Sequence, residues 1–239
     1  MTSVCIATYN GEQYIDQQLK SILLQLAPED EVIISDDGST DATIERIAAL
    51  GDARVRVMQH RRRGATQNFF VALNEAKGDY IFLADQDDVW LPGKVARCKK
   101  LLQEYDLVVS DARITDASLQ VIAPSLFQWI GSGEGLFKNW LTCTFYGSAM
   151  SFRRSVLEAA KPFPKAAYVA HDWWIGMVAE MTAKVLFLPE PLLLYRRHDA
   201  TVTQLTEGNL LTRSARPLHV KLAARCQMAW LLIKYRWTH

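Results

Sequence analysis

Three carboxylates fall within four residues at Asp85, Asp87 and Asp88, directly after the apolar run 80–84. Carboxylates this close repel one another unless a cation neutralises them. Their oxygens suit Mg²⁺ or Mn²⁺, which proteins often hold with one or two carboxylates and the phosphates of a substrate. A solvated acidic turn before a helix is the alternative interpretation. The position directly after an apolar strand favours the metal.

A further carboxylate, Asp172, lies between His171 and two consecutive tryptophans, at the predicted start of a helix. An aspartate there is often a plain N-cap. It could also be a general base held beside an acceptor by an aromatic wall, because apolar surroundings raise a carboxylate pKa. Taken alone, the segment favours the cap.

Three weaker signals each allow two interpretations. Asp37 could belong to an ordinary turn, or it could accept a hydrogen bond from a base or a ribose hydroxyl. Tyr9 could stack on a base or pack in the core. His198 could bind a metal or lie on the surface, and Arg196 and Arg197 beside it could meet a diphosphate.

Apolar runs alternate with helical patterns over the first half of the chain, and this alternation predicts the elements that position these residues. Strands are expected at 3–8, 31–35, 55–58, 80–84 and 107–110, with helices at 15–26, 44–50, 65–77 and 91–104. Ser39 or Thr40 could cap the second helix. The pattern indicates an α/β fold with a mostly parallel central sheet flanked by helices. Ligands bind at the carboxyl ends of such strands, so the polar clusters should converge there.

The second half is less regular. Residues 112–142 are expected to be loop-rich, followed by a strand at 144–152 and a short helix at 153–161. A helix at 172–183 and a strand at 184–188 complete the expected elements.

Composition limits the class of protein. The chain has 239 residues, of which 49% are hydrophobic and 22% charged, as in globular proteins. Lysine plus arginine (27) nearly balances aspartate plus glutamate (26), which argues against a nucleic-acid-coating polycation. No apolar run approaches the roughly 18 residues of a membrane-spanning helix. The scattered cysteines, without a CxxC pair, favour a reduced, cytoplasmic protein.

Taken together and in this order, these clusters resemble a family 2 glycosyltransferase with the GT-A fold. The matching segments are 3–11, 31–41, Asn68, 78–81, 85–90, 147–149, 171–174 and 195–198. The segments DQDDVW and HDWW are most similar to the rhamnosyltransferase-like branch that builds bacterial surface polysaccharides such as LPS, O-antigen and capsule.

The resemblance implies a nucleoside-diphosphate sugar donor, Mn²⁺ or Mg²⁺, and inversion of the anomeric centre in one displacement. It implies that Thr8, Tyr9 and Asp37 hold the base, Asp85 faces the ribose, and Asp87 binds the metal with His198. Asp172 would be the general base that deprotonates the acceptor hydroxyl. Asn68 and Arg63 resemble positions on the donor side. The donor would be dTDP-rhamnose or a UDP-hexose, and the acceptor a saccharide or a lipid-linked saccharide.

On this basis we expect a GT-A domain over 1–205, with a nucleotide-binding half at 1–110 and an acceptor half at 111–205. A basic amphipathic helical tail is expected over 206–239, because no acidic residue follows Leu210. This tail could lie on the inner face of the cytoplasmic membrane. It could equally dock on the core or on a second subunit.

Two other functions compete. A nucleotidyltransferase would carry a Gly-rich, basic loop after the first strand, where this chain has only Asn10-Gly11-Glu12. A non-catalytic scaffold that binds sugar nucleotides or glycans is the alternative from another class. The presence of all the acids that the mechanism needs argues against it.

Overall fold

The computed structural model describes residues 1–61, 63–198 and 217–238. Its strands form one sheet that runs through both halves of the chain. They are β1 (Thr2–Thr8), β2 (Glu31–Asp36), β3 (Val55–Gln59), β4 (Tyr80–Asp85), β5 (Val89–Trp90), β6 (Leu107–Thr115), β7 (Val121–Ala123), β8 (Met150–Arg153) and β9 (Val185–Arg196).

The order across the sheet is β3-β2-β1-β4-β8-β6-β9-β5, with β7 beside β6. The first four strands of that order are parallel. Strand β8 is antiparallel to β4 and β6, whereas β6 and β9 run parallel. The expected α/β fold with a mostly parallel sheet is therefore confirmed, and its carboxyl edge collects the loops after β1, β2 and β4.

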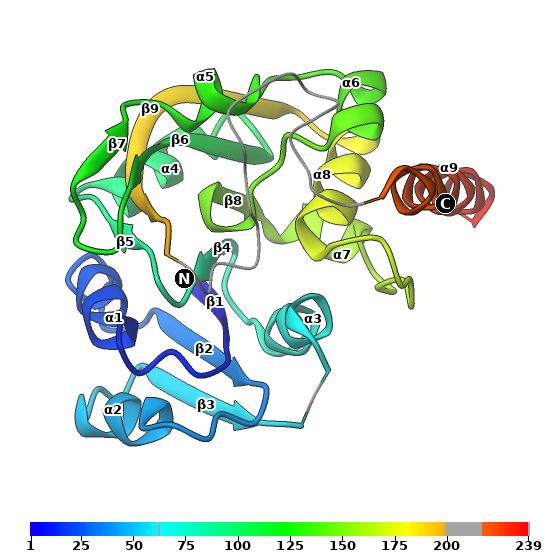
Figure 1. Ribbon diagram of the computed structural model, residues 1–239. Coiled ribbons are helices and arrows are strands. Elements are labelled where there is room, and N and C mark those ends of the chain that lie inside the picture. Colours follow the sequence, from blue (N-terminus) through cyan, green and yellow to red (C-terminus); the bar gives the residue numbers. More distant parts are fainter. Residues whose placement is uncertain (62, 199–216, 239) are drawn as a thin grey trace.

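The helices are α1 (Ile15–Leu23), α2 (Thr43–Ala49), α3 (Ala65–Glu75), α4 (Lys94–Leu101), α5 (Leu126–Ile130), α6 (Leu136–Thr142), α7 (Arg154–Ala159), α8 (His171–Thr182) and α9 (Leu218–Thr238). Figure 1 shows α1 and α2 on one side of β1–β3 and α3 on the other. Both faces of the parallel strands are thus covered, which explains why those strands are almost continuously apolar.

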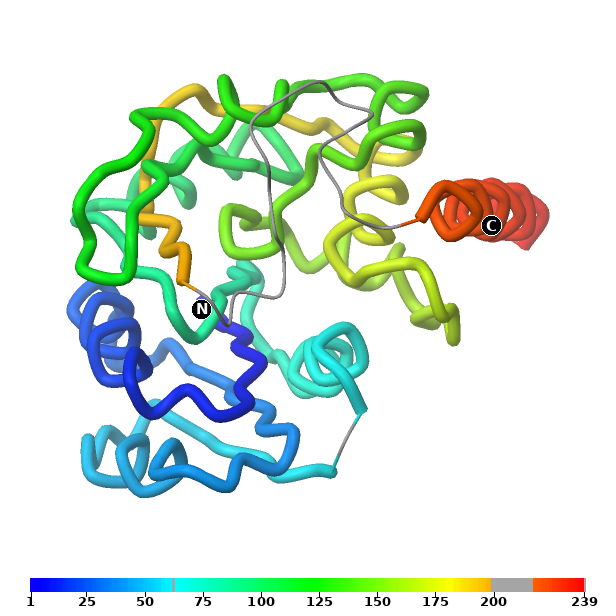
Figure 2. Tube along the Cα trace, viewed as in Figure 1, coloured from blue at the N-terminus to red at the C-terminus, as the bar shows by residue number. Residues whose placement is uncertain are grey.

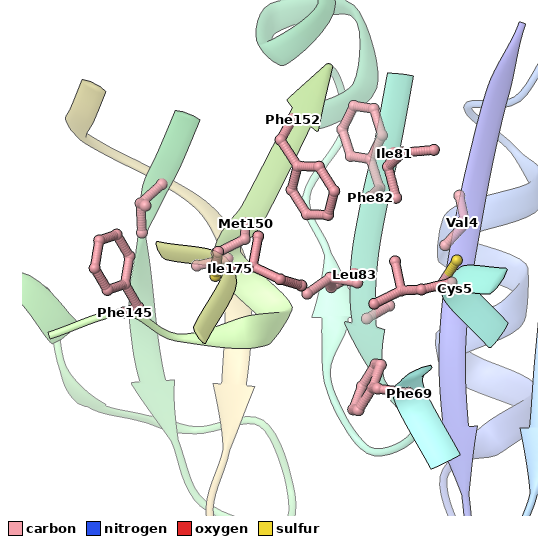
Figure 3. Close-up of a cluster of buried hydrophobic side chains, with 14 of the residues drawn as sticks. Val4, Cys5, Phe69, Ile81, Phe82, Leu83, Phe145, Met150, Phe152 and Ile175 are labelled. Atoms are coloured by element: carbon pink, nitrogen blue, oxygen red, sulfur yellow. The ribbon is translucent and has the colours of Figure 1, made fainter. Parts of the chain in front are cut away.

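The main core lies against β4, in the middle of the sheet. Ile81, Phe82 and Leu83 are fully buried. Figure 3 shows them between Val4 and Cys5 of β1 on one side and Phe152 of β8 on the other, with Phe69 of α3 packed nearby. Because β4 is anchored so firmly, the acidic loop at its end, residues 85–88, begins at a fixed point.

The second half holds more structure than its sequence predicts. Residues 112–142, expected to be loop-rich, carry β7, α5 and α6. The expected strand at 144–152 is only Met150–Arg153, preceded by a 3-10 turn at Gly147–Ala149. Strand β9 continues to Arg196 although Pro189 and Pro191 interrupt its apolar pattern. Its pairing with β6 shifts register there, which accommodates both prolines.

One expected helix start and one expected helix cap are also wrong. The helix expected at 91 begins at Lys94, because Gly93 is left-handed with φ +87° and cannot belong to the helix. Ser39 and Thr40 do not cap α2. Instead Asp41 accepts a hydrogen bond from the N–H of Thr43, and Ser39 binds Asp36.

Helix α9 packs at the edge of the molecule, beside α6 and α8, as the tube in Figure 2 shows. Ala224, Met228 and Tyr235 face the core and are buried. The tail was expected over 206–239, and its residues 206–216 and 239 lie outside the described residues. Within the described ranges, no helix combines the length and the apolar character that crossing a membrane requires.

Candidate active site

The acidic loop is held at both of its ends. Asp85 ends β4, and β5 begins four residues later at Val89. Strand β5 pairs not with β4 but with Leu193 and Leu194 of β9. This pairing brings the end of β9 next to the acidic loop and fixes where its side chains point.

His198, just beyond β9, meets the acidic loop directly. Its Nε2 lies 2.9 Å from Asp87 Oδ2, with the two side chains 13% and 18% exposed. The ring of Tyr14 packs against the imidazole at 4.7 Å between centroids. The sequence proposed Asp87 and His198 as metal ligands, and the structure brings these two side chains together.

Arg196 holds the same loop through hydrogen bonds. Its Nε donates to the carbonyl of Asp87, and its two Nη groups donate to Ala117 and Gln17. The N–H of Arg196 donates to Asp88 Oδ1. The guanidinium is therefore committed to the protein and only 3% of the residue is exposed, which corrects the suggestion that Arg196 meets a diphosphate.

The carboxylates of this loop repel one another. Burial raises the pKa of Asp85 to about 8, with further contributions from the charges of Asp87 and Asp172. Burial and the charges of Asp87 and Asp85 raise the pKa of Asp88 well above its usual range. Such a site gains from a divalent cation, because the cation removes the repulsion that raises these pKa values.

The donor set fits such a cation. Asp87 and His198 supply one oxygen and one nitrogen at the same point, and both remain partly accessible. Among residues 1–61, 63–198 and 217–238, no group of three or more His, Cys, Asp or Glu side chains forms a cage for a metal. Two protein ligands, completed by substrate phosphates, are typical of Mg²⁺ and Mn²⁺.

Asp172 comes from the second half of the chain. It lies in the first turn of α8, whose N-cap is Ala170, so Asp172 is not the cap that its isolated sequence favoured. Its Oδ1 accepts a hydrogen bond from the N–H of Trp173, and the residue is half-buried. Its charge lies near enough to Asp85 to contribute to the raised pKa of that carboxyl.

The tryptophans after Asp172 have a different role from the expected aromatic wall. Trp173 donates to the carbonyl of Asn139, and Trp174 donates to the carbonyl of Ala160. Both rings are buried. They anchor the start of α8 to its neighbours, which fixes the position of Asp172.

His171 and Gly147 form a tight contact beside Asp172. The imidazole stacks on Phe69 with ring centroids 3.9 Å apart. A Cβ on Gly147 would come within 2.9 Å of His171 Nε2 and 3.7 Å of the Asp172 Cβ. Neither ring nitrogen of His171 has a hydrogen-bond partner among the described residues. Burial lowers the pKa of His171, so it is held neutral against the charge of Asp172, which acts in the opposite direction.

On the donor side, Gln86 holds the backbone of Tyr9. Its side chain accepts from the Tyr9 N–H at 2.9 Å and donates to the Tyr9 carbonyl at 3.1 Å. The ring of Tyr9 is 52% exposed, so it is available to a ligand rather than packed in the core. Sequence reasoning gave Gln86 no role. Its place between two of the acids was the available signal.

Thr8 and Asn68 require a correction. Thr8 donates to Asp36 Oδ2, and Asn68 binds Ser35 and the carbonyl of Thr8. Both residues are only 1% exposed. Their side chains are therefore occupied inside the protein and support the ends of β1 and β2, whereas the family resemblance implied contact with a donor.

Asp37 begins the loop that follows β2. Its carboxylate accepts from the N–H groups of Arg63 and Gly64 at 2.6 and 2.9 Å, while its own N–H donates to the Thr8 carbonyl. The residue remains partly exposed, and Arg63 is exposed beside it. Asp37 thus ties three loops together at the edge where a base would bind.

A protein-family comparison bears on this geometry. The sequence model of the family described as Glycosyl transferase family 2 matches residues 3–160, which is more than half of the chain. The chain belongs to glycosyltransferase family 2.

Curated relatives agree with this family 2 assignment. An uncharacterized glycosyltransferase of Nostoc sp. is 31% identical over 215 residues, covering 83% of this chain and 65% of the relative. The family 2 chain thus spans just under two thirds of that relative's length. The dTDP-rhamnosyl transferase RfbG of Shigella flexneri is 26% identical over 81% of this chain and 72% of its own. The similarity is consistent with the rhamnosyltransferase-like branch.

Solved structures confirm the GT-A fold of this family 2 member. S. aureus TarS in complex with UDP-GlcNAc superposes with a TM-score of 0.71 at 19% identity, over 95% of this chain and 71% of TarS. The mannosyltransferase PcManGT of Pyrobaculum calidifontis, in complex with GDP-Man and Mn²⁺, gives 0.64 at 22% identity, over 83% and 57% of the two chains.

Proposed function

We propose that the chain is a metal-dependent, inverting glycosyltransferase. It would transfer a sugar from a nucleoside-diphosphate donor to a hydroxyl of a saccharide or lipid-linked saccharide. The observation that carries this proposal is the contact between Asp87 and His198 beside Asp85, together with the charge of Asp172, from the other half of the chain, close enough to act on Asp85. Asp87 and His198 on one side could bind a metal, and Asp172 on the other side is a partly exposed carboxylate.

Each residue then has one task. Tyr9 and Asp37 would hold the base, and Asp85 would receive the ribose. Asp87 and His198 would hold Mn²⁺ or Mg²⁺, which when bound neutralises the charge that develops on the diphosphate leaving group.

Asp172 would accept the proton of the acceptor hydroxyl as that oxygen attacks the anomeric carbon. Inversion needs one such base, on the face opposite the leaving group. A general base contributes roughly 10²- to 10⁴-fold to the rate. Its anchoring by the buried tryptophans supports this role, because a base must stay within hydrogen-bond reach of the acceptor.

The similarity to RfbG makes dTDP-rhamnose a candidate donor, beside UDP-hexoses. The acceptor would be an intermediate of surface-polysaccharide synthesis, such as LPS, O-antigen or capsule. A nucleotide-binding half over about 1–110 and an acceptor half over about 111–205 would work on it in the cytoplasm, at the inner face of the membrane.

The test is a calorimetric titration with UDP, dTDP and GDP and then their sugars, with and without Mn²⁺. We expect one nucleotide to bind in a metal-dependent way, and Asp87→Asn to abolish that dependence. The matched control is Glu158→Gln, which removes a surface carboxylate bound by Lys161. Failure of every nucleotide to bind at any metal concentration would contradict the proposal.

Turnover then separates the enzyme from the non-catalytic alternative. Release of nucleoside diphosphate in the presence of an acceptor supports a transferase. Metal-dependent donor binding without turnover across a panel of saccharide and lipid-linked acceptors would support a scaffold that binds sugar nucleotides or glycans.

A further inference from the structure

Helix α9 exposes an apolar stripe on the side that faces away from the protein. The stripe consists of five large side chains that are between 57% and 86% exposed: Leu218, Leu222, Trp230, Ile233 and Trp237. They follow one another at intervals of four, eight, three and four residues, the spacing of one helix face. Burial of Met228 and Tyr235 on the opposite face shows that this stripe is not the one that docks α9 on the core.

The docking of α9 fixes the direction of the stripe. Trp140 Nε1 donates to the carbonyl of Arg225, and the Arg225 guanidinium donates to the carbonyl of Leu141. The N–H of Tyr168 donates to Gln227, and Tyr235 meets the ring of Trp174 edge-on at 6.0 Å. Helix α9 is therefore held against α6 and α8 along one side, and its apolar stripe is presented outward as a fixed surface.

Charge on α9 is of one sign only. The helix contains no aspartate or glutamate. At about 100° per residue, Lys234 and Arg236 fall on the two edges of the apolar stripe. Both are exposed, and Lys234 lies over the ring of Trp230 at 5.5 Å. An apolar stripe with cations along its edges and tryptophans within it matches the boundary between lipid headgroups and acyl chains.

We propose that α9 binds the surface of an anionic lipid bilayer through this apolar stripe. The tryptophans and aliphatic side chains enter the headgroup boundary, while Lys234 and Arg236 contact lipid phosphates. Although α9 has 21 residues, it is too polar to span a bilayer, so it lies along the surface. This binding does not rest on the proposed transferase activity, and either can fail without the other.

Charge disfavours a second copy of this chain as the occupant. Symmetric pairing of two α9 stripes would bring together the same surface of both copies, and that surface carries charges of positive sign only. Helix α9 offers no carboxylate to neutralise them. An anionic bilayer supplies that negative charge.

The test is co-sedimentation of the full chain with phosphatidylcholine vesicles, with and without about one third phosphatidylglycerol. We expect binding to the anionic vesicles that weakens with salt. The triple variant Trp230→Ser/Ile233→Ser/Trp237→Ser should weaken binding on the order of tenfold or more. Lys234→Glu/Arg236→Glu should weaken it on the order of tenfold, for anionic vesicles only.

A matched control removes exposed apolar side chains elsewhere. Val121→Ser/Ile122→Ser on β7, where both residues are about half exposed, should leave vesicle binding unchanged. If the triple variant unfolds, Trp237→Ser replaces it, because that side chain is 86% exposed and removing it disturbs no packing. A wild-type chain that stays in the supernatant, or equal binding by wild type and stripe variants, overturns the proposal.

Sedimentation velocity without lipid distinguishes the competing occupant. We expect one monomeric species over the micromolar range for the wild type and the triple variant alike. A concentration-dependent dimer that the triple variant abolishes would assign the stripe to a second copy of this chain and overturn the lipid proposal.

Discussion

His198 Nε2 lies 2.9 Å from Asp87 Oδ2, although 111 residues separate the two in the chain. An imidazole and a carboxylate at this distance can exchange their mutual hydrogen bond for a shared cation. Asp87 and His198 are therefore the two side chains at which a metal ion could most readily replace a hydrogen bond within the protein.

We expect His198→Ala to weaken Mn²⁺-dependent nucleotide binding by at least 10- to 100-fold, roughly the effect of losing even an indirect contact at a metal site. Nucleotide binding without metal should be unchanged. Isothermal titration at fixed nucleotide and varied Mn²⁺ measures the effect. His60→Ala, which replaces a half-buried histidine outside this pair, is the control. Equal Mn²⁺ dependence in His198→Ala and wild type would exclude His198 as a ligand.

Replacing Asp172 with asparagine should separate binding from turnover. Asparagine keeps the shape and can still accept from the Trp173 N–H, but it cannot take a proton from an acceptor. We expect kcat to fall roughly 10²- to 10⁴-fold with the affinity for the donor unchanged. Initial rates and donor titrations on the same preparation check this. A variant that loses donor affinity and kcat together would place Asp172 on the donor side instead.

Arg196→Met should destabilise the protein by about 2 kcal/mol, because two partly buried acceptors that lose a hydrogen bond cost roughly 1 kcal/mol each. The acceptors left unmet are the carbonyls of Asp87 and Ala117. Urea unfolding measures the change. Arg97→Met, which removes a surface pair with Glu190, should cost less than about 1 kcal/mol. Similar losses in the two variants would show that Arg196 is not a structural brace.

The metal-free protein should lose stability as pH rises. Because the pKa of Asp85 is raised to about 8 in the fold and is about 3.9 when unfolded, the folded state binds more protons between these values. The contribution of Asp85 to the free energy of unfolding therefore declines from about pH 4 to about pH 8. Thermal unfolding in EDTA should show this slope, and Asp85→Asn should flatten it. Mn²⁺ with the bound nucleotide should offset it. An identical slope in wild type and Asp85→Asn would contradict the assignment.

Much of the donor side could be predicted from sequence, because it depends on local patterns. Apolar runs ending in polar residues place the acidic loop, Tyr9 and Asp37 at strand ends, and parallel strands bring those ends to one edge. The family resemblance, by contrast, assigned Thr8 and Asn68 to a ligand. Residue type alone does not tell whether a polar atom faces the ligand or is paired with a neighbour such as Asp36.

The remainder depends on contacts between residues that are distant in the chain. Nothing near Arg196 in the sequence indicates that its side chain turns inward to the Asp87 carbonyl. The prolines at 189 and 191 concealed the length of β9, since a shift in register that tolerates them is visible only with β6 beside it. The absence of a side chain at Gly147 is explained only by the fold, which places His171 where a Cβ would lie.

The pairing of β5 with β9 has a consequence for synthesis of the chain. A ribosome releases the three carboxylates of the acidic loop more than a hundred residues before Arg196 and His198, which stabilise and complete the loop. Contacts this distant in sequence form late in folding. A nascent or truncated chain that ends before β9 therefore carries the acids without their brace or their histidine. The proposed metal site is therefore complete only in chains whose sheet is already complete.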